Sequence, residues 1–183
     1  WDCCAGSGGK SIMAIDRFPG ATLTVTDSRP SILHNLQQRF AEAGIRNYHC
    51  RPLDLTDPQA ALPASPFDII IADVPCSGSG TWARTPEQLA FFDPSMIERY
   101  QPLQQKIITR LLPSLKPGGF LLYITCSVFR QENEAMVQYI SRDGRLQLIT
   151  QELLGGYDKK ADNLFAALFI ARAAQDGSVD TKN

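Results

Sequence analysis

The chain has 183 residues, 44% of them apolar and 20% charged, and a net charge of −1, a balance typical of one ordinary globular domain. No apolar run approaches the roughly 18 residues that a membrane span needs, and the cysteines lack the dense, even spacing of a disulfide framework. These features exclude a membrane-spanning or disulfide-rich secreted protein and predict a cytoplasmic chain with reduced thiols.

Apolar runs alternate along the chain with helical patterns, the order expected of a parallel sheet covered by helices on both faces. In chain order we predict strands at 1–3, 21–26, 48–53, 67–72, 120–125, 146–151 and 165–172, and helices at 10–18, 30–43, 93–115 and 132–141. The domain is predicted to cover residues 1–172, and residues 173–183 to form a polar, frayed tail.

In such a sheet, ligands bind beyond the carboxyl ends of the strands, near the point where strand order reverses. The distinctive segments of this chain all follow predicted strands: the glycine turn at 4–9, Asp27, Asp54, the loop at 73–80 and the Thr-Cys-Ser at 125–127. The sequence therefore predicts one crevice built from segments that are far apart along the chain.

The glycine turn CAGSGGKS at 4–11 must bend sharply and let a ligand approach its backbone. A phosphate-binding P-loop would need glycine where Cys4 stands, and a dinucleotide turn that starts at Gly6 would need a smaller residue than Ser11. An S-adenosylmethionine loop is less restrictive, and Asp27 suits the hydroxyls of any adenosine ribose. Taken alone, the motif leaves open S-adenosylmethionine, another nucleotide and a purely structural turn.

Cys76 and Cys126 end two strands that are expected to be neighbours, so their thiols are predicted to face one pocket. The alternative is that each is a small buried apolar side chain, the commonest state of a free cysteine. The setting of Pro75, Gly78 and Gly80 indicates an irregular loop instead of a packed strand. Cys126 is also expected directly before a helix, whose N-terminus would favour a thiolate.

Other clusters are less informative. The chain has no C-x-x-C pair, and adjacent Cys3 and Cys4 suit few structural zinc sites, so no metal is expected. Phe91, Phe92 and Tyr100 are consistent with stacking on a base and equally with core packing.

With these motifs together, the chain resembles the Fmu/Sun family of RNA cytosine-5 methyltransferases over essentially its whole length. Residues 2–10 (DCCAGSGGK) resemble the family's adenosylmethionine loop, and 73–81 (DVPCSGSGT) resemble its Pro-Cys motif. The segment from LKPGG at 115–119 through TCS at 125–127 to ENE at 132–134 resembles its nucleophile motif. The last two motifs together are highly specific, because few other families place cysteines in this way.

The resemblance implies an α/β, Rossmann-like class I methyltransferase fold whose mostly parallel sheet has seven strands, the last one antiparallel. It implies Cys126 as the nucleophile, Cys76 as the residue needed to release product, Asp73 between cofactor and target base, and Lys10 reaching into the crevice. Asp27 would hold the ribose and Asp54 the adenine amino group. The implied S-adenosylmethionine site comprises Cys4, Ala5, Gly6, Ser7, Gly8, Gly9, Lys10, Asp27, Asp54 and Asp73.

Two departures from the family pattern stand out: Gly6-Ser7 replace Ala-Pro, and 163–169 (NLFAALF) replace a closing Asp-Gly-Phe-Phe. The family also has an upstream RNA-binding extension. Only residues 1–3 precede the glycine turn, and basic residues are scattered. We therefore expect a monomeric fragment, without a membrane or metal partner, whose ribosomal or transfer RNA is held mainly by a missing upstream part.

The chemistry explains the need for two thiols. Carbon 5 of cytosine is a poor nucleophile until a thiolate, here Cys126, adds to carbon 6. Asp73 would stabilise the charge that develops, and Cys76 would assist release of the product. The target base must be unpaired or flipped out, because base stacking hides both carbons.

Three alternatives stay open. A DNA cytosine-5 methyltransferase would use the Pro-Cys cysteine, Cys76, as its nucleophile. An amino methyltransferase would carry an aromatic residue in the loop that here reads Val74-Pro75-Cys76. The non-enzymatic alternative is a cofactor-binding or RNA-scaffolding module that has lost its activity.

Overall fold

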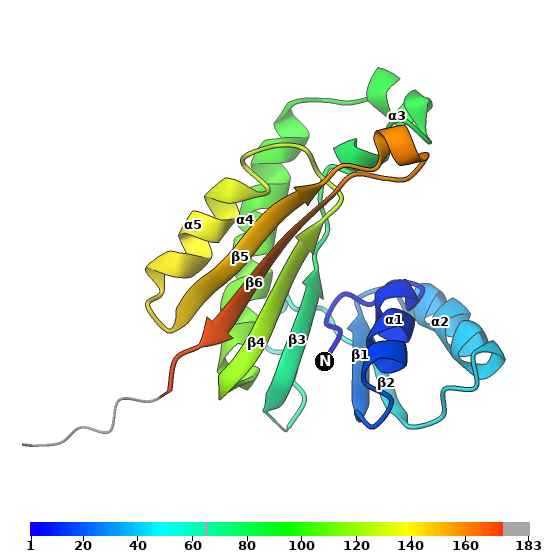
Figure 1. The fold of residues 1–183 in the computed structure, drawn as a ribbon, viewed down its shortest axis with the longest axis vertical. Helices are drawn as coiled ribbons and strands as arrows, with labels where there is room; N and C mark the ends of the chain where they lie inside the picture. The colour runs from blue at the N-terminus through cyan, green and yellow to red at the C-terminus, as the bar shows by residue number, and fades with distance from the viewer. Residues whose placement is uncertain (65, 174–183) are drawn as a thin grey trace, which may run out of the picture.

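Two groups of strands make up the protein in the computed structural model, which describes residues 1–64 and 66–173. One is a four-stranded sheet in the order β3-β4-β6-β5, and the other is the pair β1-β2 (Figure 1). The predicted frayed tail at 173–183 lies, apart from Ala173, outside the described residues.

The elements follow the predicted α/β alternation. They are α1 (Gly9–Arg17), β1 (Leu23–Asp27), α2 (Pro30–Glu42), β2 (Tyr48–Pro52), β3 (Phe67–Asp73), α3 (Pro86–Ala90), α4 (Ser95–Leu111), β4 (Leu115–Thr125), α5 (Glu134–Arg142), β5 (Leu146–Leu154) and β6 (Leu164–Ala171), with short 3₁₀ turns at Ser79–Thr81, Leu112–Ser114 and Tyr157–Lys159. The short helix α3 was not predicted. Its five residues are too few for a helical periodicity to show in the sequence.

The expected seven-stranded sheet is only partly formed, because the described residues contain six strands. Asp2 stands where the seventh is expected, and makes parallel bridges to Val25 of β1 and Ile71 of β3. The backbone N–H of Cys3 donates to the carbonyl of Ile71 at 3.0 Å. Asp2 thus pairs with both groups of strands and joins them. No longer strand forms here, because the chain turns away at Cys4 into the glycine loop.

The strand order brings the two cysteine loops together. β3 and β4 are parallel, with Asp73 opposite Ile124, so both strands end at the same edge. β6 is antiparallel to both β4 and β5, which confirms the expected antiparallel last strand.

Several predicted boundaries were wrong. Helix α4 covers Ser95–Leu111 instead of 93–115, and β5 extends to Leu154 instead of ending at residue 151. β4 begins at Leu115 instead of residue 120, because α4 already ends at Leu111, before Pro113. The predicted turn at 116–119 lies inside β4 and interrupts its register with β3. Helix α5 begins at Glu134 instead of residue 132.

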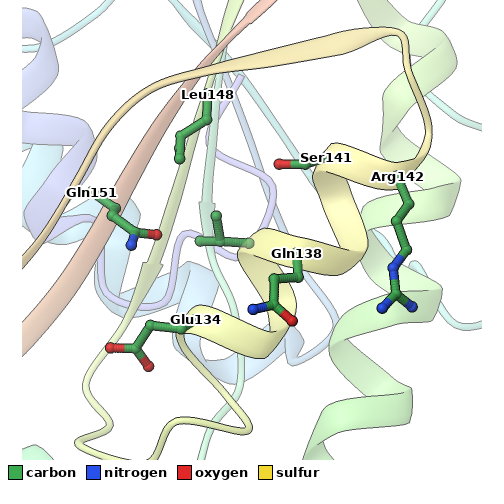
Figure 2. A pocket seen from close by; sticks show the side chains of 7 residues that line it. Glu134, Gln138, Ser141, Arg142, Leu148 and Gln151 are labelled. Carbon is green, nitrogen blue, oxygen red and sulfur yellow. The ribbon is translucent and has the colours of Figure 1, made fainter.

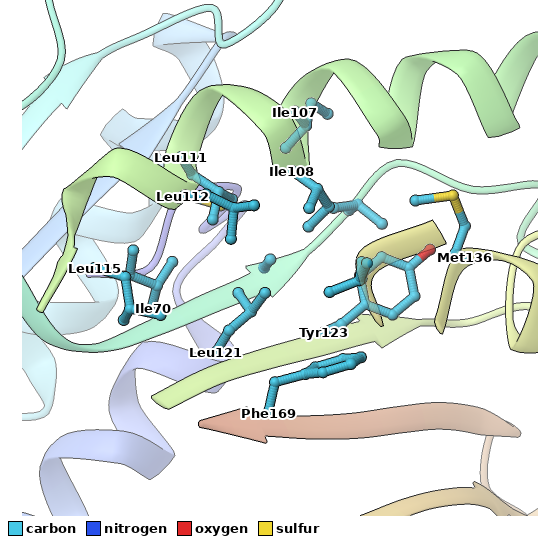
Figure 3. Packing of buried hydrophobic residues seen from close by; sticks show 14 of the residues in the cluster. Ile70, Ile107, Ile108, Leu111, Leu112, Leu115, Leu121, Tyr123, Met136 and Phe169 are labelled. Carbon is cyan, nitrogen blue, oxygen red and sulfur yellow. The ribbon is translucent and has the colours of Figure 1, made fainter. Parts of the chain in front are cut away.

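A continuous apolar core fixes this arrangement. Figure 3 shows Ile107, Ile108 and Leu111 of α4 lying over Ile70 of β3 and Leu121 of β4, all of them buried. A second cluster holds the β1-β2 pair against α2 and is formed by Ala5, Leu23, Val25, Leu33, Leu36 and Phe40. Within the described ranges, no helix is both long and apolar enough to cross a membrane.

The second cluster also explains a glycine in the glycine turn at 4–9. Gly8 has a φ of 83°, and a Cβ there would lie 2.7 Å from Phe40 and 2.9 Å from Leu36. Only glycine therefore allows the loop to pack this closely on α2 while it turns into α1.

Candidate active site at the ends of β3 and β4

The thiols of Cys76 and Cys126 lie side by side, with 3.3 Å between their Sγ atoms. Each cysteine sits in the loop that follows its parallel strand, and each is half-buried. The prediction that neighbouring strands bring the two thiols together is confirmed by this contact, and the shared pocket stays a prediction.

The surroundings of the two thiols differ. The pKa of Cys126 is lowered, mainly because the Cys76 thiol donates a hydrogen bond to its sulfur; the Lys10 ammonium acts in the same direction, whereas burial and the Asp73 carboxylate oppose the change. The pKa of Cys76 is raised by the same hydrogen bond, by burial and by the negative charges of Cys126 and Glu132. Cys126 is therefore the better thiolate of the pair, and Cys76 keeps its proton.

Lys10 and Asp73 form an ion pair beside the thiols. Lys10 comes from the first turn of α1, Asp73 is the last residue of β3, and their Nζ and Oδ2 atoms are 2.5 Å apart. Burial raises the pKa of Asp73, while Lys10 acts in the opposite direction. The fold thus gathers Lys10, Asp73, Cys76 and Cys126, which are distant in sequence.

The expected helix directly after Cys126 is absent, since residues 127–133 form a loop before α5. The reason is that Glu132 and Asn133 are buried and bind the loop instead of continuing a helix. Asn133 accepts a hydrogen bond from the Thr125 hydroxyl at 2.6 Å and donates one to the carbonyl of Ser127 at 2.8 Å. The lowered pKa of Cys126 therefore comes from Cys76 and Lys10, not from a helix N-terminus.

Glu132 and the serines at 77 and 127 were missed as site residues in the sequence. Ser77 follows Cys76, Ser127 follows Cys126, and both hydroxyls donate to the buried Glu132 carboxylate at 2.5 Å. The repeated Cys-Ser pair was a signal for this contact, but only the fold shows that one carboxylate serves both serines.

The segment before β6 contacts the site through its backbone. Gly80 donates its N–H to the carbonyl of Cys126 at 2.8 Å and accepts from the N–H of Asn163 at 2.9 Å. A Cβ at Gly80 would lie 2.2 Å from the Asn163 carbonyl oxygen, so glycine is required there. The unusual sequence at 163–169 thus keeps a backbone role beside the thiols.

The glycine loop lies at the carboxyl end of β1. Gly6 has a φ of 53°, with no atom within 4 Å of the place where a Cβ would stand. Ala5 donates its N–H to the carbonyl of Thr26, and Ser7 accepts two hydrogen bonds from Arg39, each at 2.9 Å. The loop is anchored on one side by these contacts and open on the other at Gly6.

The two predicted nucleoside carboxylates lie at the ends of β1 and β2. Asp27 accepts hydrogen bonds from the N–H of Gly6 at 2.9 Å and from Arg29; burial acts against its ionisation, but these bonds outweigh burial and lower its pKa. Asp54 is exposed and caps the backbone N–H of Thr56. The N–H of Leu53 donates to the carbonyl of Asp27, which holds the two strand ends together.

Asp2 lies under the loop as a fully buried carboxyl group. Its Oδ2 atom accepts a hydrogen bond from the Ser11 hydroxyl at 2.6 Å, whereas its Oδ1 atom has no partner in the described part of the chain. Burial raises the pKa of Asp2 to about 6, although the Ser11 bond opposes the change.

This raised pKa predicts a pH-dependent effect of Asp2→Asn. Between pH 3.8 and about 6 the folded protein keeps a proton on Asp2 that the unfolded chain releases, so the wild type loses stability as pH rises through this range. The stability of Asp2→Asn relative to wild type should therefore increase by roughly 2 kcal/mol between about pH 4 and pH 7. Urea unfolding of both proteins at each pH measures the difference in their free energy of unfolding. A difference that is the same at pH 4 and pH 7 would contradict the expectation.

The aromatic residues of the site divide between packing and exposure. Phe92 packs against Trp82 and stacks on Phe129, with ring centroids 4.9 and 5.3 Å apart. Phe91 is 85% exposed. The sequence left open whether these two phenylalanines stack on a base or pack internally. Phe92 packs internally, whereas the exposed ring of Phe91 is open to a ligand.

A separate hollow lies between α5 and β5 and is shown in Figure 2. It is lined by Glu134, Val137, Gln138, Ser141, Arg142, Leu148 and Gln151, none of which is a predicted site residue. Within residues 1–64 and 66–173, no group of three or more His, Cys, Asp or Glu side chains is placed to hold a metal ion.

Known structures share this fold. Pyrococcus horikoshii NSun6, solved with SFG, superposes with a TM-score of 0.82 at 20% identity, covering 93% of this chain and 47% of that one. The N-methyltransferase NodS of Bradyrhizobium japonicum, in complex with S-adenosyl-L-homocysteine, gives a TM-score of 0.62 at 16% identity, covering 93% and 76%. The chain therefore has the class I S-adenosylmethionine-dependent methyltransferase fold.

Sequence relatives narrow the assignment. The ribosomal RNA small subunit methyltransferase B of Xanthomonas campestris is 33% identical over 138 residues, which are 75% of this chain and 32% of the relative. The methyltransferase F of Escherichia fergusonii is 34% identical over 143 residues, 76% and 29% of the two chains. The chain thus spans about a third of the length of these relatives.

A family model agrees with these relatives and with the resemblance in the sequence motifs. The model described as 16S rRNA methyltransferase RsmB/F matches residues 1–177, which is nearly the whole chain. The chain belongs to the 16S rRNA methyltransferase RsmB/F family.

Proposed function

We propose that this chain is the catalytic part of an S-adenosylmethionine-dependent enzyme that methylates carbon 5 of a cytosine in small subunit ribosomal RNA. The observation that carries the proposal is the contact between Cys76 and Cys126 beside the Lys10–Asp73 pair. The names of the relatives support ribosomal RNA as the substrate. We also propose that the protein is a monomer, and the net charge of −1 favours a wider RNA grip that lies outside this chain.

The residues beyond β1 and β2 fit S-adenosylmethionine. The open backbone at Gly6 leaves room for a ligand, and the unpartnered Oδ1 of buried Asp2 lies beneath the loop. We assign the cofactor to the loop Cys4, Ala5, Gly6, Ser7, Gly8, Gly9 and Lys10, with Asp73 at its reactive end. When bound, the cofactor supplies an electrophilic methyl group on a sulfonium.

The nucleoside end of this site involves Asp27 and Asp54. Asp27 is proposed to bind the ribose hydroxyls, which would replace contacts now made by Arg29, whose side chain is 63% exposed and free to move. Asp54 is proposed to accept the adenine amino group, since its carboxylate is exposed at the end of the neighbouring strand.

The thiol pair assigns the chemical roles. The Cys126 thiolate adds to carbon 6 of the flipped cytosine, and electron density moves to carbon 5, which takes the methyl group. Asp73, held by Lys10, hydrogen-bonds the ring nitrogen or amino group and stabilises the charge formed during addition. A water molecule then takes the carbon 5 proton, the electrons of that bond re-form the double bond between carbons 5 and 6, and the Cys126 sulfur leaves as a thiolate, with Cys76 assisting this release.

The asymmetry of the pair separates this proposal from a DNA cytosine-5 methyltransferase, in which Cys76 would attack. The hydrogen bond between the two thiols lowers the pKa of Cys126 and raises that of Cys76, and the anion of Glu132 raises the pKa of Cys76 further. This asymmetry favours Cys126 as the nucleophile, although the Asp73 anion offsets the effect of the Lys10 cation on it.

The test is methyl transfer by the natural full-length protein. With methyl-labelled S-adenosylmethionine and a small subunit ribosomal RNA transcript, we expect label in 5-methylcytidine after digestion to nucleosides. A DNA of matching sequence is the control and should stay unlabelled. Label on an amino group, on a ribose or only in DNA would overturn the proposal.

A further inference from the structure

We infer that Glu132 is a positioning residue that sets the relative placement of the Cys76 and Cys126 thiols. The inference rests on the proposed function for what the thiols do, but the placement itself is a property of the fold. Glu132 contacts neither sulfur through the hydrogen bonds described here; it acts through the residues that follow them.

One buried carboxylate binds both cysteine loops. Its Oε1 atom accepts the backbone N–H of Ser77 at 2.8 Å, and its Oε2 atom accepts the hydroxyls of Ser77 and Ser127, each at 2.5 Å. The two serine hydroxyls are also 3.2 Å apart. Because each serine directly follows one of the cysteines, a movement of Glu132 would be passed to both sulfur atoms.

Core residues on α4 and β4 also hydrogen-bond to Glu132 and fix its position. The amide nitrogen of buried Gln104, on α4, donates to Glu132 at 3.2 Å and to the carbonyl of Pro75 at 3.0 Å. The Tyr123 hydroxyl, on β4, donates to the Glu132 carbonyl at 2.7 Å. Glu132 is fully buried, so these bonds are not exchanged with water, and the group is fixed by core elements.

The same residue contributes charge as well as geometry. Its negative charge is among the causes that raise the pKa of Cys76. Fixing the carboxylate beside Ser77 therefore supports the division between a protonated Cys76 and a thiolate at Cys126. Glu132→Gln keeps the shape of the side chain, removes the charge and replaces one acceptor oxygen with a donor, so it tests both effects.

The first arm of the test measures geometry without RNA. Diamide, a thiol oxidant, takes two electrons and two protons from a pair of thiols that can meet, and leaves a disulfide and a hydrazine. We expect rapid formation of the Cys76–Cys126 disulfide in wild type, identified by peptide mass mapping, and formation slower by about tenfold in Glu132→Gln. Equal rates would overturn the inference.

The matched control is Glu134→Gln. Glu134 has the same side chain two residues further on, but lines the hollow between α5 and β5 (Figure 2), and its variant should oxidise like wild type. Ser77→Ala and Ser127→Ala each remove one hydroxyl contact and keep the carboxylate. Each should slow oxidation by roughly two- to threefold, which keeps the test open if Glu132→Gln folds poorly.

The second arm uses RNA and separates the two proposals. With the full-length protein, Glu132→Gln should lower kcat about tenfold or more and leave the KM for S-adenosylmethionine unchanged, because the hydrogen bonds of Glu132 go to the cysteine loops and the core and not to the cofactor loop. If wild type transfers no methyl group to RNA but oxidation still slows in Glu132→Gln, the proposed function fails and the positioning role stands. If wild type is active and Glu132→Gln matches it in both arms, the positioning role fails alone.

Discussion

Cys126→Ser is expected to abolish both methyl transfer and the covalent adduct with RNA. A serine hydroxyl is not ionised at neutral pH and gains little from the Lys10 cation, so addition to carbon 6 should be slower by roughly four orders of magnitude or more. The adduct is best measured with RNA that contains 5-fluorocytidine. Fluorine at carbon 5 blocks the elimination step, so wild type accumulates a complex that survives denaturing electrophoresis.

The control for this variant is binding of cofactor. Serine differs from cysteine by one atom, and Cys126 is only half-buried, so folding and S-adenosylmethionine affinity should match wild type. An adduct that still forms at wild-type rate in Cys126→Ser would show that another residue attacks the base.

Cys76→Ala is expected to trap the adduct on ordinary RNA. Wild type should release methylated RNA, whereas the variant lacks the protonated thiol that we assign to release and should lower kcat by roughly two to three orders of magnitude. Denaturing electrophoresis of the variant with unmodified RNA and S-adenosylmethionine would detect a band of protein bound to RNA. The variant also loses the hydrogen bond that lowers the pKa of Cys126, so adduct formation should be slower than in wild type.

Cys50→Ala is the matched control for Cys76→Ala. Cys50 is another half-buried cysteine, but it lies on β2 and packs with the second apolar cluster. This variant should turn over without a trapped adduct. If Cys76→Ala abolishes the adduct and Cys126→Ser accumulates it, the two roles are reversed and the enzyme follows the DNA-type assignment.

Local patterns were sufficient for most of the fold. The buried apolar run of β3 and the helical spacing of α2 identified these elements within one or two residues, because burial and periodicity are local properties. The boundary at α5 was wrong for a nonlocal reason. Residues 132 and 133 have helix-compatible patterns, but their side chains are bound by partners as far away as Ser77.

The site shows the same division. The two Cys-Ser pairs, the glycine turn and the acids after each strand were visible in the sequence, and their positions at strand ends predicted a common crevice. The Lys10–Asp73 pair and the contact of Ser77 with Glu132 were not visible, since each joins residues more than 50 positions apart. The ion pair between Arg29 and Asp27 was also seen only in the structure.

The sequence alone determined the α/β class and the family and supplied the candidate reactive side chains, because these depend on residue types and short spacings. The tertiary structure decided which thiol is the better anion and what holds the pair together. That outcome depends on a hydrogen bond between two sulfurs that strand order brings together, and on the buried Glu132 anion, which acts on Cys76.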